Sequence, residues 1–141
     1  MLEQASSRLS IQKLSYEQAE GLYPLLYRQV SQGGDPTHQP AFVYIGQKEG
    51  NYVGFMACYR HNIETAYIQY AGFLPEYQGY PVVPFLKQAL AYVHEEFRYI
   101  LALIQNDNVR ALRVAMACGF KIIGIRQATD KTLLVELLKE K

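Results

Sequence analysis

The sequence lacks the features that mark secreted, membrane and metal-binding proteins. It has two cysteines, Cys58 and Cys118, which are too few for a disulfide framework and match no zinc-site spacing. Its longest purely apolar run covers residues 99–104, far short of the ~20 residues that a membrane span needs. Residues 1–10 contain no apolar stretch of a secretory signal. We therefore expect a cytoplasmic protein with free buried thiols, no bound metal and no membrane partner.

A strong charge of either sign is also missing. The formal net charge is +1, from 14 Lys and Arg against 13 Asp and Glu, and the basic residues are scattered. A nucleic-acid partner is therefore not expected. Tryptophan is absent, but 12 tyrosines are present and half of the residues are hydrophobic, which is typical of a compact globular chain. A length of 141 residues suits one domain, residues 1–141, with one hydrophobic core.

The first half of the chain reads as a strand, a helical segment, a loop and three strands. Ser15 is a suitable cap for the helical segment, and Pro24 is expected to break or kink it. Residues 31–40 are dense in Gly, Pro and polar residues and predict a loop. Two hairpin signals separate the three strands, and the third strand is apolar on both faces, which predicts a central place in the sheet. The four predicted strands cover residues 8–14, 41–47, 52–60 and 65–74.

The second half alternates helices and strands. Residues 84–97 predict an amphipathic helix that opens at Pro84 and carries His94 on its polar side. Asn108 precedes a second helix, which stops at Gly119. The predicted strands of this half cover residues 99–104, 120–127 and 131–139. The resulting order β-α-β-β-β-α-β-α-β-β indicates a single α/β domain.

A tight loop joins the third strand to the helix at residues 84–97. At such a junction the backbone N–H groups and the helix dipole can bind a phosphate. The loop reads "PEYQGYPVVP", with prolines and a valine where phosphate loops usually have glycine. The alternative reading is that Pro81 and Pro84 simply begin a helix that binds no ligand.

Two longer stretches, "FLPEYQGYPVVPFLKQAL" and "LIQNDNVRALRVAMACGF", resemble the two signature regions of the GNAT acyltransferase superfamily. The residues that carry the resemblance are Pro75, Tyr77, Gln78, Gly79, Asn108, Ala111, Gly119 and Phe120. The strand order is similar too, so the resemblance covers essentially the whole chain. It implies a GNAT-like α/β domain with a central mixed, mostly antiparallel sheet of about six or seven strands flanked by about four helices. It also implies acetyl-CoA as co-substrate.

The resemblance implies a set of cofactor-binding residues. Gln78 would open the pyrophosphate loop, residues 71–74 would pair with the pantetheine arm through their backbone, and Asn108 would contact that arm or only cap its helix. The full implied set is Ala71, Phe73, Leu74, Gln78, Gly79, Tyr80, Val82, Val83 and Asn108.

The loop departs from the family pattern at three positions. Pro81 occupies a glycine position, Val83 adds bulk at a Gly or Ala position, and Pro81 and Pro84 each remove an N–H donor. Each lost charge-assisted bond would weaken binding of acetyl-CoA by ~1.5–3 kcal/mol.

The catalytic groups are less clear than the cofactor site. Amine acetylation needs a base for the amine and often an acid for the departing thiolate. Where many family members have a tyrosine, this chain has Ala115, and the acid nearest to the central strand is Glu64. We therefore regard Glu64 and Tyr70 as tentative catalytic residues. Tyr67 and Tyr70 are also suited to holding water or substrate, or to packing.

These features predict an N-acetyltransferase that acts on a primary amine of a small molecule or a protein. The alternative is a catalytically silent GNAT-fold module that binds a partner. The resemblance places the acceptor pocket mainly within residues 15–40 and 120–135, which have no charge cluster that would name the acceptor. Residues 131–139 form a potential exposed edge strand, which predicts a homodimer.

Overall fold

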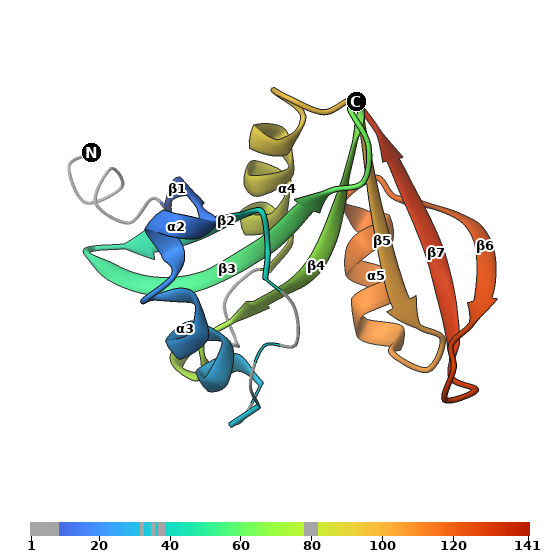
Figure 1. Ribbon diagram of the computed structural model, residues 1–141, viewed down its shortest axis with the longest axis horizontal. Helices are drawn as coiled ribbons and strands as arrows, with labels where there is room; N and C mark the ends of the chain where they lie inside the picture. Colours follow the sequence, from blue (N-terminus) through green and yellow to red (C-terminus); the bar gives the residue numbers. More distant parts are fainter. Residues whose placement is uncertain (1–8, 32, 35, 37–38, 78–81) are drawn as a thin grey trace.

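A mixed sheet of seven strands forms the centre of the molecule (Figure 1). The computed structural model describes residues 9–31, 33, 34, 36, 39–77 and 82–141. The strand order is β1-β2-β3-β4-β5-β7-β6, and every neighbouring pair is antiparallel except β4 and β5. The strands are β1 (Ser10–Ser15), β2 (Phe42–Lys48), β3 (Asn51–Arg60), β4 (Thr65–Phe73), β5 (Tyr99–Gln105), β6 (Lys121–Gln127) and β7 (Leu133–Glu140). The predicted mixed, mostly antiparallel sheet and the central place of β4 are confirmed.

Within the described residues, four helices and a short 3-10 turn accompany the strands. They are α2 (Tyr16–Ala19), α3 (Tyr23–Val30), η1 (Pro75–Tyr77), α4 (Val82–Val93) and α5 (Val109–Ala117). Ser15 begins α2 with a capping box, in which its hydroxyl accepts from the N–H of Gln18 at 3.2 Å. The predicted break is confirmed because Pro24 lies in the first turn of a separate helix, α3. The helix predicted for residues 84–97 instead begins at Val82 and ends at Val93.

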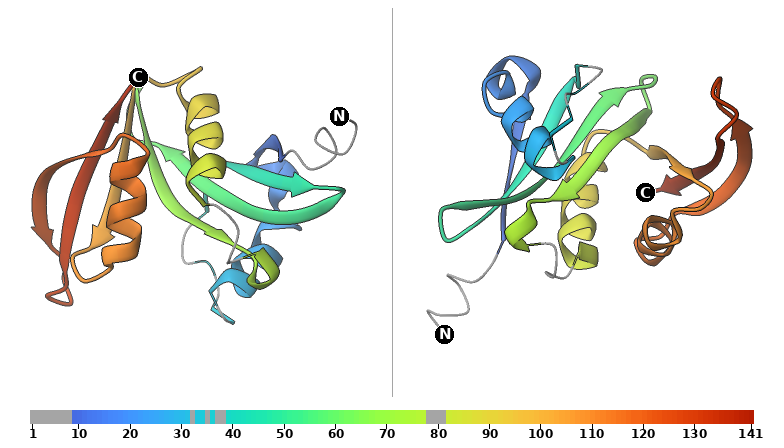
Figure 2. Two further views of the ribbon diagram at one scale, coloured as in Figure 1. Left: turned by 180° about the vertical axis from the view of Figure 1, so that it is seen from behind. Right: turned by 90° about the horizontal axis from the view of Figure 1, so that it is seen from below.

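The helices cover both faces of the sheet (Figure 2). Helices α2 and α3 pack through Ala19, Tyr23 and Leu26 against β2 and β3. Helices α4 and α5 pack on the opposite face, where Ala89, Leu90, Val93 and Ala115 belong to a core cluster with residues of β2, β3, β4, β5 and β7. The expectation of one core is therefore wrong, because alternating strand residues bury apolar side chains on two faces of the sheet. Cys58 and Cys118 are free and buried, as expected.

Two glycines allow the helices to approach the sheet closely. A Cβ atom on Gly46 would lie 2.2 Å from Cε2 of Phe85 in α4. A Cβ atom on Gly72 would lie 2.4 Å from Cγ1 of Val30 in α3. Both distances are too short for real contacts, so any side chain at these positions would push a helix outward.

The final hairpin differs from the expectation in the strand that it exposes. Strand β7 lies between β5 and β6, whereas β6 is the edge strand. The prediction that residues 131–139 form an exposed edge is therefore wrong. The reason is burial: Val135 and Leu137 of β7 belong to the main core, whereas nearly all of β6 is exposed. No helix among the described residues is long and apolar enough to cross a membrane.

His94 also differs from its expected place on the polar side of its helix. It is only 6% exposed and follows the last turn of α4. Its Nδ1 lies 2.9 Å from the carbonyl oxygen of Phe97, and its Nε2 lies 2.9 Å from Nζ of Lys139. Burial lowers the pKa of His94. A neutral ring that donates from Nδ1 to Phe97 and accepts at Nε2 from Lys139 satisfies both contacts.

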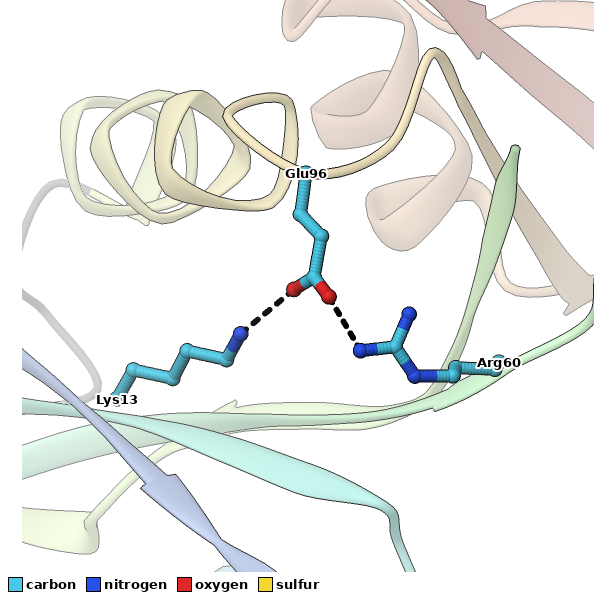
Figure 3. Close-up of polar contacts among 3 residues, drawn as sticks. All are labelled: Lys13, Arg60 and Glu96. Atoms are coloured by element: carbon cyan, nitrogen blue, oxygen red, sulfur yellow. Dashed lines mark hydrogen bonds and ion pairs between the residues drawn. The ribbon is translucent and has the colours of Figure 1, made fainter. Parts of the chain in front are cut away.

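Glu96 joins three elements just after α4 (Figure 3). Its carboxylate accepts from Nζ of Lys13 in β1 at 2.8 Å and from the guanidinium of Arg60 in β3. The hydrogen bonds from Lys13 and Arg60 lower the pKa of Glu96. Each exposed ion pair contributes only about 0–1 kcal/mol, but here one carboxylate holds two strands.

We expect Glu96→Gln to lower the melting temperature by about 1–4 °C at pH 7. The folded pKa of Glu96 is depressed, so its contribution is present above the ordinary carboxyl pKa, about 4.3, and is lost as pH falls through the folded value. The difference in melting temperature should therefore shrink on acidification. Thermal unfolding by circular dichroism at pH 7 and pH 3 measures it. Glu95→Gln is the control, and a difference that is the same at both pH values would contradict the prediction.

Candidate functional site

Strands β4 and β5 pair over only part of their length. Four parallel pairs run from Thr65 opposite Tyr99 to Ile68 opposite Ala102. Beyond them β4 continues to Phe73 and β5 to Gln105, and the two strands diverge (Figure 1). Each strand remains paired on its other side, β4 with β3 and β5 with β7. The facing backbone edges of the two strands therefore border a split that leaves N–H and C=O groups available to a ligand.

A β-bulge marks the apex of this split. Ile68 pairs with Cys58 and Tyr70 pairs with Ala57, so Gln69 is an extra residue in β4. It directly follows the last residue of β4 that pairs with β5. Because a bulge interrupts the alternation of side chains, Tyr67, Gln69 and Tyr70 all line the same pocket.

Both connections at the open end of the split lead into helices. Strand β4 is followed by η1 and α4, and β5 is followed by α5. Because the two strands are parallel, the positive ends of both helix dipoles lie at the end where the strands diverge. This arrangement suits a ligand that carries phosphate groups.

The first turn of α4 contains two of the residues that depart from the family pattern, Val83 and Pro84. Pro84 is the third residue of α4, where a helix uses no N–H for its own hydrogen bonds, so the proline breaks no bond of the helix. Val83 is half-buried and packs against the core, so at least part of its bulk points into the protein. The predicted contacts of Gln78, Gly79, Tyr80 and Pro81 lie outside the described residues, and those of Val82 remain a prediction.

The predicted residues of β4 reach the split in different ways. Ala71 is exposed, whereas Phe73 and Leu74 are 6% exposed, and the ring of Phe73 packs on that of Phe85 with centroids 5.0 Å apart. The N–H of Leu74 donates to the carbonyl of Val53 at 2.9 Å, so this donor is already used. Any contact of this segment with a ligand would therefore be through backbone groups, and it remains a prediction.

Asn108 caps α5. Its Oδ1 accepts from the N–H of Ala111 at 3.2 Å. The side chain is exposed at the open end of the split. The capping role is thus present in the structure, and contact with a cofactor remains a prediction.

Two substitutions separate these roles of Asn108. Asn108→Asp keeps the capping oxygen but removes the amide donor, whereas Asn108→Ala removes both. Asn108→Ala should lower stability by about 0.5–2 kcal/mol, and Asn108→Asp should not. If the amide also holds the cofactor, both variants should weaken CoA binding in calorimetry. Wild-type affinity in Asn108→Asp would show that the residue is a cap alone.

The two tentative catalytic residues lie at opposite ends of the paired segment. Glu64 is exposed in the turn before β4, and its carbonyl accepts from the N–H of Tyr99 at 2.9 Å. Tyr70 lies just past the apex of the split. At about 3.3 Å per strand residue the two are roughly 20 Å apart along the chain, so the structure does not bring them together. Ala115 is buried in α5.

A pocket lined by tyrosines opens beside the apex. Its volume is ≈ 270 Å³. Its lining comes from α3, the following loop, β3 and β4 and consists of Tyr23, Tyr27, Pro36, Tyr59, Tyr67, Gln69 and Tyr70. Residues 15–40 contribute three residues to this lining, and residues 120–135 contribute none. Tyr23, Tyr27, Tyr59 and Gln69 were not among the predicted site residues, and the only sequence signal for them is the abundance of tyrosine.

The polar groups of the described lining are tyrosine hydroxyls and the amide of Gln69. Burial raises the pKa of Tyr23, Tyr67 and Tyr70, so these hydroxyls keep their protons at neutral pH. Oε1 of Gln69 is buried and has no hydrogen-bond partner among the described residues. A buried acceptor without a partner costs about 1–3 kcal/mol, and because this oxygen has less than 1 Å² of accessible surface, a ligand would reach it only after the Gln69 side chain moves. Within the described ranges, no three His, Cys, Asp or Glu side chains gather into a metal set.

Comparison with known proteins identifies the family of this chain. The model of the Acetyltransferase (GNAT) family matches residues 8–120. The chain therefore belongs to the GNAT acetyltransferase family, and the resemblance inferred from the sequence is confirmed. No curated protein matched the sequence.

Solved structures with the same fold have little sequence identity to the chain. An IAA acetyltransferase from Bacillus cereus ATCC 14579 has a TM-score of 0.76 at 15% identity, over 95% of this chain and 100% of that one. A chimera of spermidine N-acetyltransferase SpeG from Vibrio cholerae and hSSAT has a TM-score of 0.75 at 14% identity, over 95% and 96%. A GNAT family acetyltransferase from Elizabethkingia anophelis, with acetyl-CoA bound, has a TM-score of 0.70 at 14% identity, over 94% and 98%.

Proposed function

We propose that this protein is an N-acetyltransferase that transfers the acetyl group of acetyl-CoA to a primary amine. The observation that carries the proposal is the split between β4 and β5, with an open backbone edge on each side and two helix N-termini at its mouth. Membership of the GNAT family supports it, as does the related structure that holds acetyl-CoA. We also propose that the reaction takes place in the cytoplasm.

The described residues fit the parts of acetyl-CoA in a simple order. The backbone of β4 beyond Gln69 would pair with the pantetheine arm, and the N-terminus of α4 would face the phosphates. The thioester would then lie near the bulge, beside the tyrosine pocket. Asn108 would meet the arm from the β5 side of the split.

The transfer itself is a nucleophilic acyl substitution. The neutral amine nitrogen forms a bond to the acetyl carbon, the carbon–sulfur bond breaks, and the sulfur leaves with its electron pair as a thiolate. The proton that the nitrogen then loses passes to solvent or to the thiolate. Since Tyr70 keeps its proton, its hydroxyl is suited to donate a hydrogen bond to the thiolate rather than to act as a base. Glu64 at the closed end would act only through intervening water. Holding the two reactants together can supply much of the rate.

A silent binding module is the second candidate function. The observation that favours it is Ala115, which leaves no proton donor at that place in α5. Pro84 also favours the silent module, because it has no backbone N–H to donate to a phosphate and so weakens the phosphate site. This candidate differs from the first in a measurable property, the affinity for acetyl-CoA.

We expect isothermal titration to show micromolar binding of acetyl-CoA and of CoA to the whole chain. Pantetheine, which lacks the phosphates, should bind more weakly, because it makes no contact with the helix N-termini. The gap between CoA and pantetheine should narrow as salt is added. Absence of binding at millimolar acetyl-CoA would overturn the enzyme proposal and favour the silent module.

We also propose a homodimer, through β6 rather than through the originally expected strand. β6 is the edge of the sheet, and its Ile122, Ile123 and Ile125 are 53%, 54% and 68% exposed. An exposed apolar edge strand is suited to antiparallel pairing with its own copy about a two-fold axis. Such an interface closes on itself, so it would stop at two copies.

Light scattering of the purified chain should give a mass near twice 16.1 kDa. The double variant Ile123→Lys, Ile125→Lys should give the monomer mass because it places like charges in the interface. Ile63→Lys, at a residue that is 90% exposed in the β3–β4 turn, is the matched control and should remain dimeric. A monomeric wild type at high concentration would refute the dimer.

A further inference from the structure

We infer that His94 and Lys139 form an acid-sensitive latch between the end of α4 and β7, which opens when the imidazole of His94 takes up a proton. The latch consists of three groups: the ring of His94, the carbonyl of Phe97 and the ammonium of Lys139. It is a property of the fold, so it holds whether or not the protein transfers an acetyl group.

Each nitrogen of the His94 ring has one partner. Nδ1 lies 2.9 Å from the carbonyl oxygen of Phe97, which can only accept, so Nδ1 carries a hydrogen. Nε2 lies 2.9 Å from Nζ of Lys139, which can only donate as an ammonium, so Nε2 presents its lone pair. A proton added at Nε2 would bring two donors and two positive charges together at this distance. The contact between His94 and Lys139 therefore forms only with the neutral imidazole.

No carboxylate balances a second positive charge at the latch. Among the described residues, neither His94 nor Lys139 lies within ion-pair distance of an acidic side chain. Glu96 is held by two cations of β1 and β3, and Glu140 is held by Arg98. The titratable groups around the latch, taken from every element packed against it, are Lys87, Glu95, Glu96, Arg98, Cys118, Lys139, Glu140 and Lys141.

Burial opposes protonation of His94 in the same way. The residue is 6% exposed, and burial lowers its pKa. The hydrogen bond to Phe97 acts against this shift, whereas the charges of Lys139 and Lys141 add to it. A surface hollow of ≈ 400 Å³ lies beside the ring, so protons of the solvent can reach it. Cys118 contributes no charge at neutral pH, because burial raises the pKa of its thiol.

The lowered pKa fixes the direction of the pH effect. The unfolded chain binds a proton at His94 near the ordinary pKa of about 6.5, and the folded chain binds it only at lower pH. The contribution of the latch to stability is therefore complete above about pH 6.5. It is lost as pH falls from there toward the folded pKa.

The latch lies where α4, α5, β5 and β7 meet at the closed end of the split. His94 follows the last turn of α4, and residues 95–98 lead directly into β5, whose four pairs with β4 begin at Tyr99. The stem of Lys139 passes the end of α5, where its Cε lies 3.5 Å from the position that a Cβ atom on Gly119 would take. Opening the latch would loosen the connection between α4 and β5, and with it the alignment of the strands that border the split.

The first test compares the pH dependence of stability in the whole chain. Between pH 7.5 and pH 5.5 the melting temperature of the wild type should fall by about 2–5 °C more than that of His94→Gln, whose side chain is neutral at both pH values. His61→Gln, at an exposed histidine outside the latch, is the matched control and should fall as the wild type does. Equal changes in the wild type and in His94→Gln would overturn the latch.

A second variant serves if His94→Gln does not fold. Lys139→Met removes the ammonium and keeps an apolar stem of similar length, so a protonated His94 meets no like charge at Nε2. The pKa of His94, measured by NMR titration of its ring hydrogens, should therefore be higher in Lys139→Met than in the wild type. An unchanged pKa, or a wild-type value at or above about 6.5, would contradict the inference.

Hydrogen exchange locates the opening. Peptides that cover residues 94–102 and 135–140 should exchange at least about threefold faster at pH 5.5 than at pH 7.5, once the intrinsic effect of pH on exchange is removed. Peptides of β2 and β3 should show no such increase, and neither should the same peptides in His94→Gln. An increase that is uniform along the chain, or none at all, would refute a local latch.

Acetyl-CoA affinity connects the latch to the split. Between pH 7.5 and pH 5.5, the affinity of the wild type in calorimetry should fall at least about threefold more than that of His94→Gln. An equal fall in both would overturn the effect of the latch on the split. Absence of acetyl-CoA binding at either pH would instead overturn the proposed function, and hydrogen exchange would then decide the latch alone.

Discussion

The site depends on a parallel contact between β4 and β5 that stops after four residue pairs. If the ladder continued, the backbone groups of both strands would satisfy one another and no ligand could enter the sheet. The sheet stays whole because β3 and β7 pair with the outer sides of the two strands, and α4 and α5 pack under both halves. The bulge at Gln69 accompanies this change, because it bends β4 where its pairing with β5 ends. An opening within a continuous core is therefore compatible with a stable domain.

The same geometry separates two chemical environments on either side of the apex. At the open end lie the N-termini of α4 and α5, which favour negative charge. Beside the apex, on the side of α3, lies a pocket whose described lining consists of five tyrosines, Pro36 and Gln69. A phosphate-bearing donor and its acceptor would thus bind in different places and meet near the bulge.

Local pattern predicted most of the fold, and long-range contacts explain what it missed. Alternation, caps and proline placed nearly every element, and the cap at Asn108 follows from its position before an amphipathic helix. The edge strand was not predictable, because either strand of a hairpin can dock on β5. The pocket could not be predicted from the sequence for a related reason. Tyr23, Tyr59 and Tyr67 come together only when the sheet forms. The bulge at Gln69 also shifts the side-chain alternation of β4 by one residue. Burial of His94 likewise depends on Lys139 of the distant β7.

Whether the protein is an enzyme or a silent module depends on how much affinity for acetyl-CoA is lost through the departures from the family pattern near α4. Pro84 removes an N–H group that the helix does not use for its own hydrogen bonds. Its only effect on binding is therefore that a ligand can form at most one hydrogen bond fewer. Val83 places part of its side chain against the core rather than outward. Meanwhile the larger features, the split and the two helix N-termini at its mouth, are present among the described residues, and they keep the main backbone groups that a phosphate-bearing ligand would use.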